Sequence, residues 1–255
     1  MRYKAVIFDL FDTVVLFDYA KMPEIVVDGE TRRTTMGKTY EILRERHPSL
    51  GWDAFFGALA EVDAALRPLK EAGREVHSVD RFRRVLEALR LPGSESLSDD
   101  FVESLVARHM EALLGCAHLP DDHPAILEAL GRDYRLALLS NFDYAPAARK
   151  MLDDMGLRDY FLKIAISDEL GWRKPHPRVF QALVEELGVE PAESLYVGDT
   201  FEIDVVGAKA AGLDAAWVNP SGKVPGDGGV RPDIEVRSLA ELRRRLMPDE
   251  EGENR

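Results

Sequence analysis

The spacing of apolar and polar positions changes twice along this 255-residue chain. A short apolar run at residues 3–8 is typical of a buried strand. From about residue 36 to 114, apolar residues recur at intervals of three and four, which predicts amphipathic helices. From residue 124 onward, apolar runs of strand length alternate with helical segments. This alternation predicts an α/β fold with a doubly wound parallel sheet.

The first predicted strand stands far from the other strands in sequence, because the next strand signal comes near residue 135. We therefore expect one Rossmann-like α/β core that is interrupted by an inserted α-helical domain. The expected boundaries are residues 1–16 and 116–246 for the core, 17–115 for the helical insertion and 247–255 for a polar tail.

Local signals refine the insertion. Residues 24–33 predict a β-hairpin that turns at Asp28-Gly29, a dipeptide typical of a type I′ turn. Ser78 and Ser98 each stand at the start of a helical pattern, and we expect Ser78 to act as a helix N-cap.

The composition limits the classes of partner. The net charge of −13 argues against nucleic acid or an anionic membrane surface as the main partner. A small anionic substrate stays compatible, because the charge of a cleft can oppose the net charge. The one cysteine, Cys116, fits a reducing compartment. With no signal-peptide pattern and no membrane-length apolar run, we expect a soluble cytoplasmic protein, and the sequence leaves its oligomeric state open.

Polar residues follow the predicted strands at the points where they end. In open α/β sheets, ligands bind beyond the carboxyl ends of the strands, so these residues are expected to converge. Each has an ordinary structural explanation when taken alone, such as a turn or a helix cap. Clustered carboxylates repel one another, however, unless a cation or a catalytic role holds them together. The residues at the strand ends are Asp9, Asp12, Ser140, Asn141, Lys174, Asp199 and Asp204.

Four sequence segments carry these residues: "DLFDT", "LLSN", "RKPHPRVF" and "VGDTFEID". In this order and spacing they resemble the four motifs of the haloacid dehalogenase-like hydrolase superfamily. The helical insertion after the first motif resembles that superfamily's cap domain. The resemblance extends over nearly the whole chain, and the combination is specific although each motif alone is weak.

The resemblance implies a role for each motif residue. Asp9 would attack phosphorus and form an aspartyl-phosphate, which divides a difficult displacement into two steps. Ser140 and Lys174 would bind the phosphoryl oxygens, and Lys174 would also offset the charge of Asp9. Asp199 would hold Mg²⁺ together with Asp9, because a hard cation with oxygen ligands neutralises the approach of two anions. Asp204 would support that metal or orient Lys174.

The first motif departs from the pattern of the family's phosphatases at two positions. Phe11 stands where these enzymes carry an aspartate that protonates the leaving group. The backbone carbonyl of Phe11 can still serve as the metal ligand that the resemblance implies. Asp12 replaces the usual glycine, and two interpretations stay open: a substitute acid, or a turn-forming aspartate that bonds within its own loop.

Two other interpretations remain beside the phosphatase. L-2-haloacid dehalogenases of this superfamily also carry an aromatic residue at the position of Phe11, and they need neither acid nor metal. They resemble Ser-Asn, however, where this chain has Gly198-Asp199, and a second metal-type acid makes little sense without a metal. The third interpretation is a catalytically inactive module that binds phosphate. We favour the phosphatase because the other motif residues are retained.

The expected substrate is a small phosphorylated or otherwise anionic molecule. We place Phe11 and Asn141 in its binding pocket, and Arg32 and Arg33 of the hairpin could reach it from the insertion. The insertion carries no recognisable substrate signature, so sugar phosphates, nucleotides and acyl phosphates all stay open.

Overall fold

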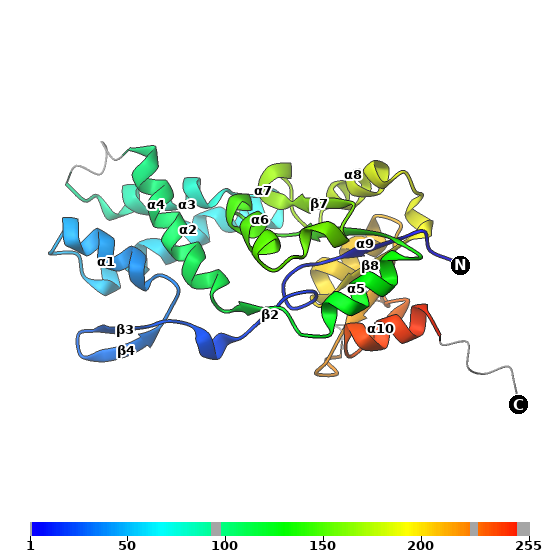
Figure 1. Cartoon of the computed structure of the whole chain (residues 1–255). Helices are drawn as coiled ribbons and strands as arrows, with labels where there is room; N and C mark the ends of the chain where they lie inside the picture. Colours follow the sequence, from blue (N-terminus) through cyan, green and yellow to red (C-terminus); the bar gives the residue numbers. More distant parts are fainter. Residues whose placement is uncertain (1, 93–97, 225–228, 249–255) are drawn as a thin grey trace, which may run out of the picture. The chain divides into compact units, whose positions relative to one another are not determined.

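The computed structural model describes residues 2–92, 98–224 and 229–248, and its contacts divide the chain into two units (Figure 1). The core unit comprises Met1–Leu16, Leu119–Asn141 and Leu152–Arg255. The helical unit comprises Phe17–His118 and Phe142–Met151. It thus takes in a segment directly after Asn141 that the sequence pattern places in the core.

The core unit is built on one six-stranded sheet in the order β10-β9-β8-β1-β6-β7, and every pairing in it is parallel. The chain runs from β1 to one side through β6 and β7, and then crosses to the other side for β8, β9 and β10. The predicted doubly wound parallel sheet is confirmed. Its strands are β1 (Ala5–Phe8), β6 (Arg135–Ser140), β7 (Lys163–Ile166), β8 (Ser194–Gly198), β9 (Asp214–Val218) and β10 (Ile234–Val236).

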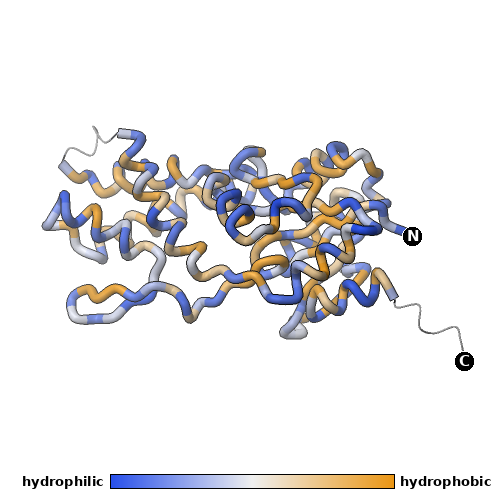
Figure 2. Tube along the Cα trace, in the orientation of Figure 1, coloured by the Kyte–Doolittle hydropathy of each residue, from blue (hydrophilic) through white to orange (hydrophobic). Residues whose placement is uncertain are grey.

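Strand β1 lies at the centre of the sheet, and all four of its residues are buried. A strand covered by helices on both faces needs apolar residues at every position, not at alternate ones. Figure 2 shows hydrophobic residues along the strands of this sheet. The helices of the core unit are α5 (His123–Gly131), α7 (Ser167–Leu170), α8 (Pro177–Leu187), α9 (Val206–Ala210) and α10 (Leu239–Leu246), with α6 (Ala145–Asp154) running across the division between the units.

The helical unit holds the expected helices and the expected hairpin. Strands β3 (Glu24–Val27) and β4 (Glu30–Arg33) pair antiparallel, and the two residues between them, Asp28 and Gly29, have φ values of 54° and 81°. Positive φ at both positions is what a type I′ turn requires, so the predicted turn is confirmed. The helices are α1 (Gly37–Arg46), α2 (Trp52–Glu71), α3 (Ser78–Leu89) and α4 (Asp99–Leu114), and a short two-stranded sheet pairs β2 (Leu16–Phe17) with β5 (Ala117–His118).

The two serines at helix starts differ in the structure. Ser98 is the N-cap of α4, and its hydroxyl accepts a hydrogen bond from the Phe101 amide at 3.3 Å. The prediction for Ser78 is wrong, because α3 already begins at Ser78 and His77 holds the cap position. The backbone amide of Ser78 donates to the Asp143 carbonyl at 2.8 Å, a contact between distant segments that local sequence does not show.

Candidate active site

Three predicted site residues follow neighbouring strands of the core sheet. Asp9 directly follows β1, Ser140 is the last residue of β6, and Asp199 directly follows β8. Strand β1 pairs with both β6 and β8, and the Asp9 amide donates to the Val197 carbonyl at 2.8 Å. The parallel register therefore brings these side chains to the same edge of the sheet, where the order of the strands reverses.

Lys174 enters the same site from the loop after β7. Its ammonium lies 2.6 Å from Asp9 Oδ1, 2.8 Å from Asp204 Oδ1 and 2.7 Å from the Tyr196 hydroxyl. An ammonium has three N–H donors, and these three bonds use all of them. Tyr196 carries no sequence signal of this role, because its strand "SLYVG" has the pattern of an ordinary core strand.

Asn141 holds the backbone of Lys174. Its side-chain amide donates to the Lys174 carbonyl at 2.9 Å, and its Oδ1 accepts from the Lys174 amide at 2.8 Å. The peptide bond between Lys174 and Pro175 is cis. The sequence analysis placed Asn141 in the substrate pocket, and these contacts give it a second task, which is to fix the loop that carries Lys174.

Asp204 is engaged through both of its carboxylate oxygens. Oδ1 accepts from Lys174, and Oδ2 accepts from the Thr200 amide at 2.9 Å. A Cβ atom at Gly198 would lie 2.4 Å from the Asp204 carboxylate, so only glycine fits there. This geometry supports the orientation of Lys174 by Asp204, the second of the two roles that the resemblance implies.

The carboxylates of Asp9, Asp199 and Asp204 form a group that could hold a metal ion, because one oxygen atom of each lies within 4.8 Å of the others. Burial, opposed in part by the charge of Lys174, raises the pKa of Asp9 from 3.8 to about 7. Burial and the charges of Asp204 and Asp12 raise the pKa of Asp199 to about 6. Negative charge at this site is thus only partly compensated by the chain, which suits a cation.

Lys174 keeps its charge in this environment. Burial opposes the charged form, but the neighbouring charges of Asp204 and Asp9 outweigh burial and raise the pKa of the ammonium. A fixed cation next to Asp9 therefore persists at neutral pH.

Two buried hydroxyls of the core unit have no hydrogen-bond partner among the described residues. Ser140 and Thr13 are each 1% exposed, and neither hydroxyl is bonded. A buried polar group without a partner costs free energy, so such hydroxyls are suited to a ligand that brings oxygen atoms. Ser140 was expected at the site from its strand end, whereas Thr13 was not singled out.

The loop after β1 holds the two departures from the family pattern. Asp12 adopts a left-handed backbone with φ 58°, and its amide donates to the Val15 carbonyl at 2.6 Å. The charge of Asp12 is also near enough to Asp199 to raise the pKa of that carboxyl. Asp12 thus forms part of a tight turn and also acts electrostatically on the site, so both interpretations of it remain predictions. Phe11 is half-buried in this loop.

The two arginines expected at the substrate lie on the hairpin of the helical unit. Arg32 pairs with Glu30 at 2.8 Å and Arg33 with Glu24 at 2.9 Å, and both arginines are exposed. Their part in substrate binding stays a prediction.

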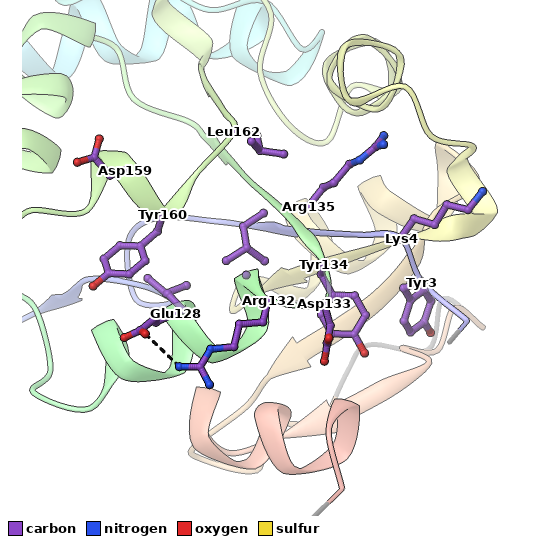
Figure 3. Close-up of a pocket in the computed structure, with 13 residues that line it drawn as sticks. Tyr3, Lys4, Glu128, Arg132, Asp133, Tyr134, Arg135, Asp159, Tyr160 and Leu162 are labelled. Atoms are coloured by element: carbon purple, nitrogen blue, oxygen red, sulfur yellow. Dashed lines mark hydrogen bonds and ion pairs between the residues drawn. The ribbon is translucent and has the colours of Figure 1, made fainter.

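A groove of about 830 Å³ lies at the opposite edge of the core sheet, next to the amino ends of β1 and β6 (Figure 3). Its basic side chains are bonded within the chain: Arg132 contacts Glu128 at 3.1 Å, and Lys4 contacts Glu193 at 2.6 Å. Arg135 donates to the Leu187 carbonyl at 2.7 Å. These three cations are already engaged, and none of the predicted site residues lines the groove.

Comparison with known proteins agrees with this geometry. The haloacid dehalogenase-like hydrolase family matches residues 3–212. N-acylneuraminate-9-phosphatase of Mus musculus is 38% identical over 125 residues, which is 49% of this chain and 50% of that protein. Glyceraldehyde 3-phosphate phosphatase of Methanopyrus kandleri is 28% identical over 253 residues, 96% of this chain and 99% of that protein. The alignment to the mouse enzyme thus spans about half the length of that relative.

A solved structure shares the fold at lower identity. The 2-haloacid dehalogenase of Pseudomonas syringae pv. Tomato DC3000 superposes with a TM-score of 0.69 at 24% identity, over 96% of this chain and 98% of that one. The family match covers all four motifs and the strand ends that carry Asp9, Ser140 and Asp199. The chain belongs to the haloacid dehalogenase-like hydrolases.

Proposed function

We propose that this hydrolase is a Mg²⁺-dependent phosphatase that acts on a small phosphorylated metabolite through an aspartyl-phosphate on Asp9. The observation that carries the proposal is the site around Asp9. One of its oxygens is held by Lys174 at 2.6 Å, and carboxylate oxygens of Asp199 and Asp204 lie within 4.8 Å. The unpaired hydroxyl of Ser140 at the end of the neighbouring strand supports a phosphoryl ligand.

The residues present fit a divalent cation. Asp9 and Asp199 would hold Mg²⁺ with the backbone carbonyl of Phe11, and Asp204 lies in the same carboxylate group while it orients Lys174. When bound, the cation would neutralise the charge that builds up as a carboxylate approaches a phosphate dianion. The raised pKa values of Asp9 and Asp199 support this assignment, because they show carboxyl groups whose charge the chain alone does not balance.

The side chains then divide the work of the first step. One oxygen of Asp9 attacks phosphorus, the bond to the leaving oxygen breaks, and that oxygen departs with the electron pair. The Ser140 hydroxyl donates to a phosphoryl oxygen. Since all three N–H groups of Lys174 are engaged in the structure, Lys174 contributes as a fixed positive charge beside Asp9.

Phe11 sets the limit of this chemistry. A positioned general acid or base contributes about 10²–10⁴-fold, and a phenyl ring supplies neither function. We therefore propose a phosphatase that favours leaving groups which depart without protonation, such as aryl and acyl phosphates. By their names, the two phosphatases act on the 9-phosphate of N-acylneuraminate and on glyceraldehyde 3-phosphate. For this chain we propose a phosphorylated metabolite as the substrate class.

The helical unit is proposed to be the substrate-selecting cap. Arg32 and Arg33 would contact an anionic part of the substrate, and replacing either by Gln should raise KM and leave kcat nearly unchanged. Equal KM values in the variants and the wild type would remove the two arginines from the substrate site.

Within the described ranges, no helix has the combined length and hydrophobicity to cross a bilayer. Cys116 is a free thiol, which supports a cytoplasmic location as part of the proposal.

A dehalogenase is the rival function, and Phe11 is the observation that favours it. The two activities differ in product and in metal dependence. Phosphate release from aryl phosphates and chloride release from 2-chloropropionate, each measured with Mg²⁺ and with EDTA, separate them. We expect phosphate release that EDTA abolishes. Chloride release that persists in EDTA would establish the dehalogenase, and no release of either product would favour an inactive phosphate-binding module.

A further inference from the structure

Tyr196 is the uncharged partner of the Lys174 ammonium. Its hydroxyl lies 2.7 Å from Nζ, beside two negatively charged acceptors, Asp9 Oδ1 at 2.6 Å and Asp204 Oδ1 at 2.8 Å. Three acceptors match the three N–H donors of an ammonium. The rotation of the ammonium about its own axis is therefore fixed by three partners in three directions.

The Tyr196 hydroxyl is itself held in place. It donates to the Leu139 carbonyl at 3.1 Å, so its lone pairs face Lys174. The ring packs edge-on against Phe180 with the ring centroids 5.0 Å apart, and Tyr196 is 0% exposed. Tyr196 lies on β8, next to the central strand β1, so the sheet itself sets the position of this hydroxyl.

The two oxygens of Asp9 differ as a result. Oδ1 accepts the bond from Lys174 at 2.6 Å, so the ammonium holds the Asp9 carboxylate at one of its two oxygens. A carboxylate that is held in one orientation is pre-positioned for attack on a bound substrate.

We propose that Tyr196 is a positioning residue: by accepting the third N–H of Lys174, it confines the ammonium to Oδ1 of Asp9 and so fixes the orientation of the attacking carboxylate. This inference rests on the proposed phosphatase function. Without the hydroxyl, the third N–H has no acceptor in its direction. The ammonium can then turn about its own axis, and the Asp9 carboxylate loses its fixed orientation.

Tyr196→Phe tests this proposal, because it removes the hydroxyl and keeps the ring. Tyr134→Phe is the matched control: Tyr134 is also buried, and its hydroxyl also donates to a backbone carbonyl, that of Leu246, at 3.1 Å. The measurement is a single turnover of p-nitrophenyl phosphate with enzyme in excess and Mg²⁺ present. We expect the first-order rate constant of nitrophenolate release to fall about tenfold in Tyr196→Phe and to stay within about twofold in Tyr134→Phe.

The rate constant separates positioning from folding. When folded enzyme is in saturating excess over the substrate, a partial loss of folded enzyme leaves the first-order rate constant unchanged. Equal rate constants in wild type and Tyr196→Phe would overturn this inference alone, whereas no release by the wild type would overturn the proposed function and this inference with it. NMR of the wild-type Lys174 ammonium adds a check without a variant: three fixed acceptors predict a resolved, slowly exchanging signal, and rapid exchange with water would contradict them.

Discussion

The ammonium of Lys174 lies 2.6 Å from Oδ1 of Asp9, and the two side chains are only 2% and 11% exposed. Burying such an ion pair costs free energy, and a buried charge that is left with no partner is strongly destabilising. Here the pair is also unequal, because Asp199 and Asp204 bring further negative charge to the same place. The site is therefore a source of instability that its function explains.

The first prediction concerns this cost. Asp9 has a pKa of about 7 in the folded protein against an ordinary 3.8. Between these two values the folded state binds more protons than the unfolded state, so the contribution of Asp9 to stability falls as pH rises from about 4 to about 7. In Asp9→Asn, Lys174 keeps Asp204 as its charged partner. The variant should therefore be more stable than the wild type in the metal-free state at pH 8, by about 1–3 kcal/mol, and should have no turnover.

Urea denaturation of both proteins in EDTA measures this effect. The gain should shrink as the pH falls from about 7 and disappear below about pH 3, where Asp9 is protonated in the folded and the unfolded wild type alike. A variant that is less stable than the wild type at pH 8 would show that the charge of Asp9 stabilises the folded protein.

The second prediction concerns the pH dependence of Mg²⁺ binding. The ion binds ionised carboxylates, and without metal the pKa values of Asp9 and Asp199 are about 7 and about 6. The affinity should be constant above pH 7, and below it should fall by about tenfold per pH unit as the first proton has to be displaced. Below pH 6 the fall should become steeper.

Isothermal titration calorimetry in buffers of different ionisation enthalpy gives both the affinity and the number of protons released. We expect about one proton released per ion at pH 6.5. An affinity that does not change between pH 5 and 8 would exclude Asp9 and Asp199 as the ligands.

The third prediction concerns Phe11. Without a general acid, turnover should depend steeply on the pKa of the leaving group, and alkyl phosphates should be cleaved about 10²–10⁴-fold more slowly than aryl phosphates. The aspartyl-phosphate should also persist, so aryl phosphates should show a burst of the first product. A series of phosphate esters of graded leaving-group pKa measures both features, and equal rates over the series would reveal a substitute acid.

Phe11→Asp is the complementary variant. It should raise turnover on alkyl phosphates more than on aryl phosphates, because only the alkyl leaving group needs a proton. An unpaired carboxylate in a half-buried position can cost several kcal/mol, so thermal unfolding of the variant is measured in parallel. A folded variant with no gain on alkyl phosphates would show that position 11 does not face the leaving group.

The fourth prediction concerns Asp12. Asp12→Asn keeps the size of the side chain and tolerates the positive φ of 58°, and it removes the charge. We expect turnover of alkyl phosphates to stay within about twofold, and the pKa of Asp199 to fall because the charge of Asp12 raises it. A loss of about 10²-fold or more with metal binding intact would identify Asp12 as the substitute acid.

The strand ends were predictable from sequence, and the contacts between them were not. Asp9, Ser140 and Asp199 each stand where an apolar run stops, and the carboxyl edge of a parallel sheet brings such positions together. The family's motifs then suggested their roles. Tyr196 carried no such signal, because a tyrosine inside an apolar strand has the same pattern whether its hydroxyl bonds a ligand, a lysine or a backbone carbonyl.

The helix patterns likewise predicted where the helices lie, but not which residues contact them. The periodicity of α6 (Ala145–Asp154) shows which of its faces is apolar, but not which unit covers that face, and residues 142–151 belong to the helical unit. Ser78 failed as a cap for a related reason. Its amide is satisfied by Asp143, a residue 65 positions away in sequence, and a pairing of that kind leaves no local signal.

The central claim is that Asp9 forms a covalent bond to phosphorus. Acid quenching during turnover of an aryl phosphate, followed by mass spectrometry of the peptide that contains residues 5–13, tests it most directly. We predict a peptide heavier by one phosphoryl group, with the modification on Asp9, in the presence of Mg²⁺ but not in EDTA or in Asp9→Asn. Two results would contradict the account. One is full turnover of the phosphate ester with an unmodified Asp9 peptide at every quench time. The other is an ester bond between Asp9 and the carbon of a 2-haloacid.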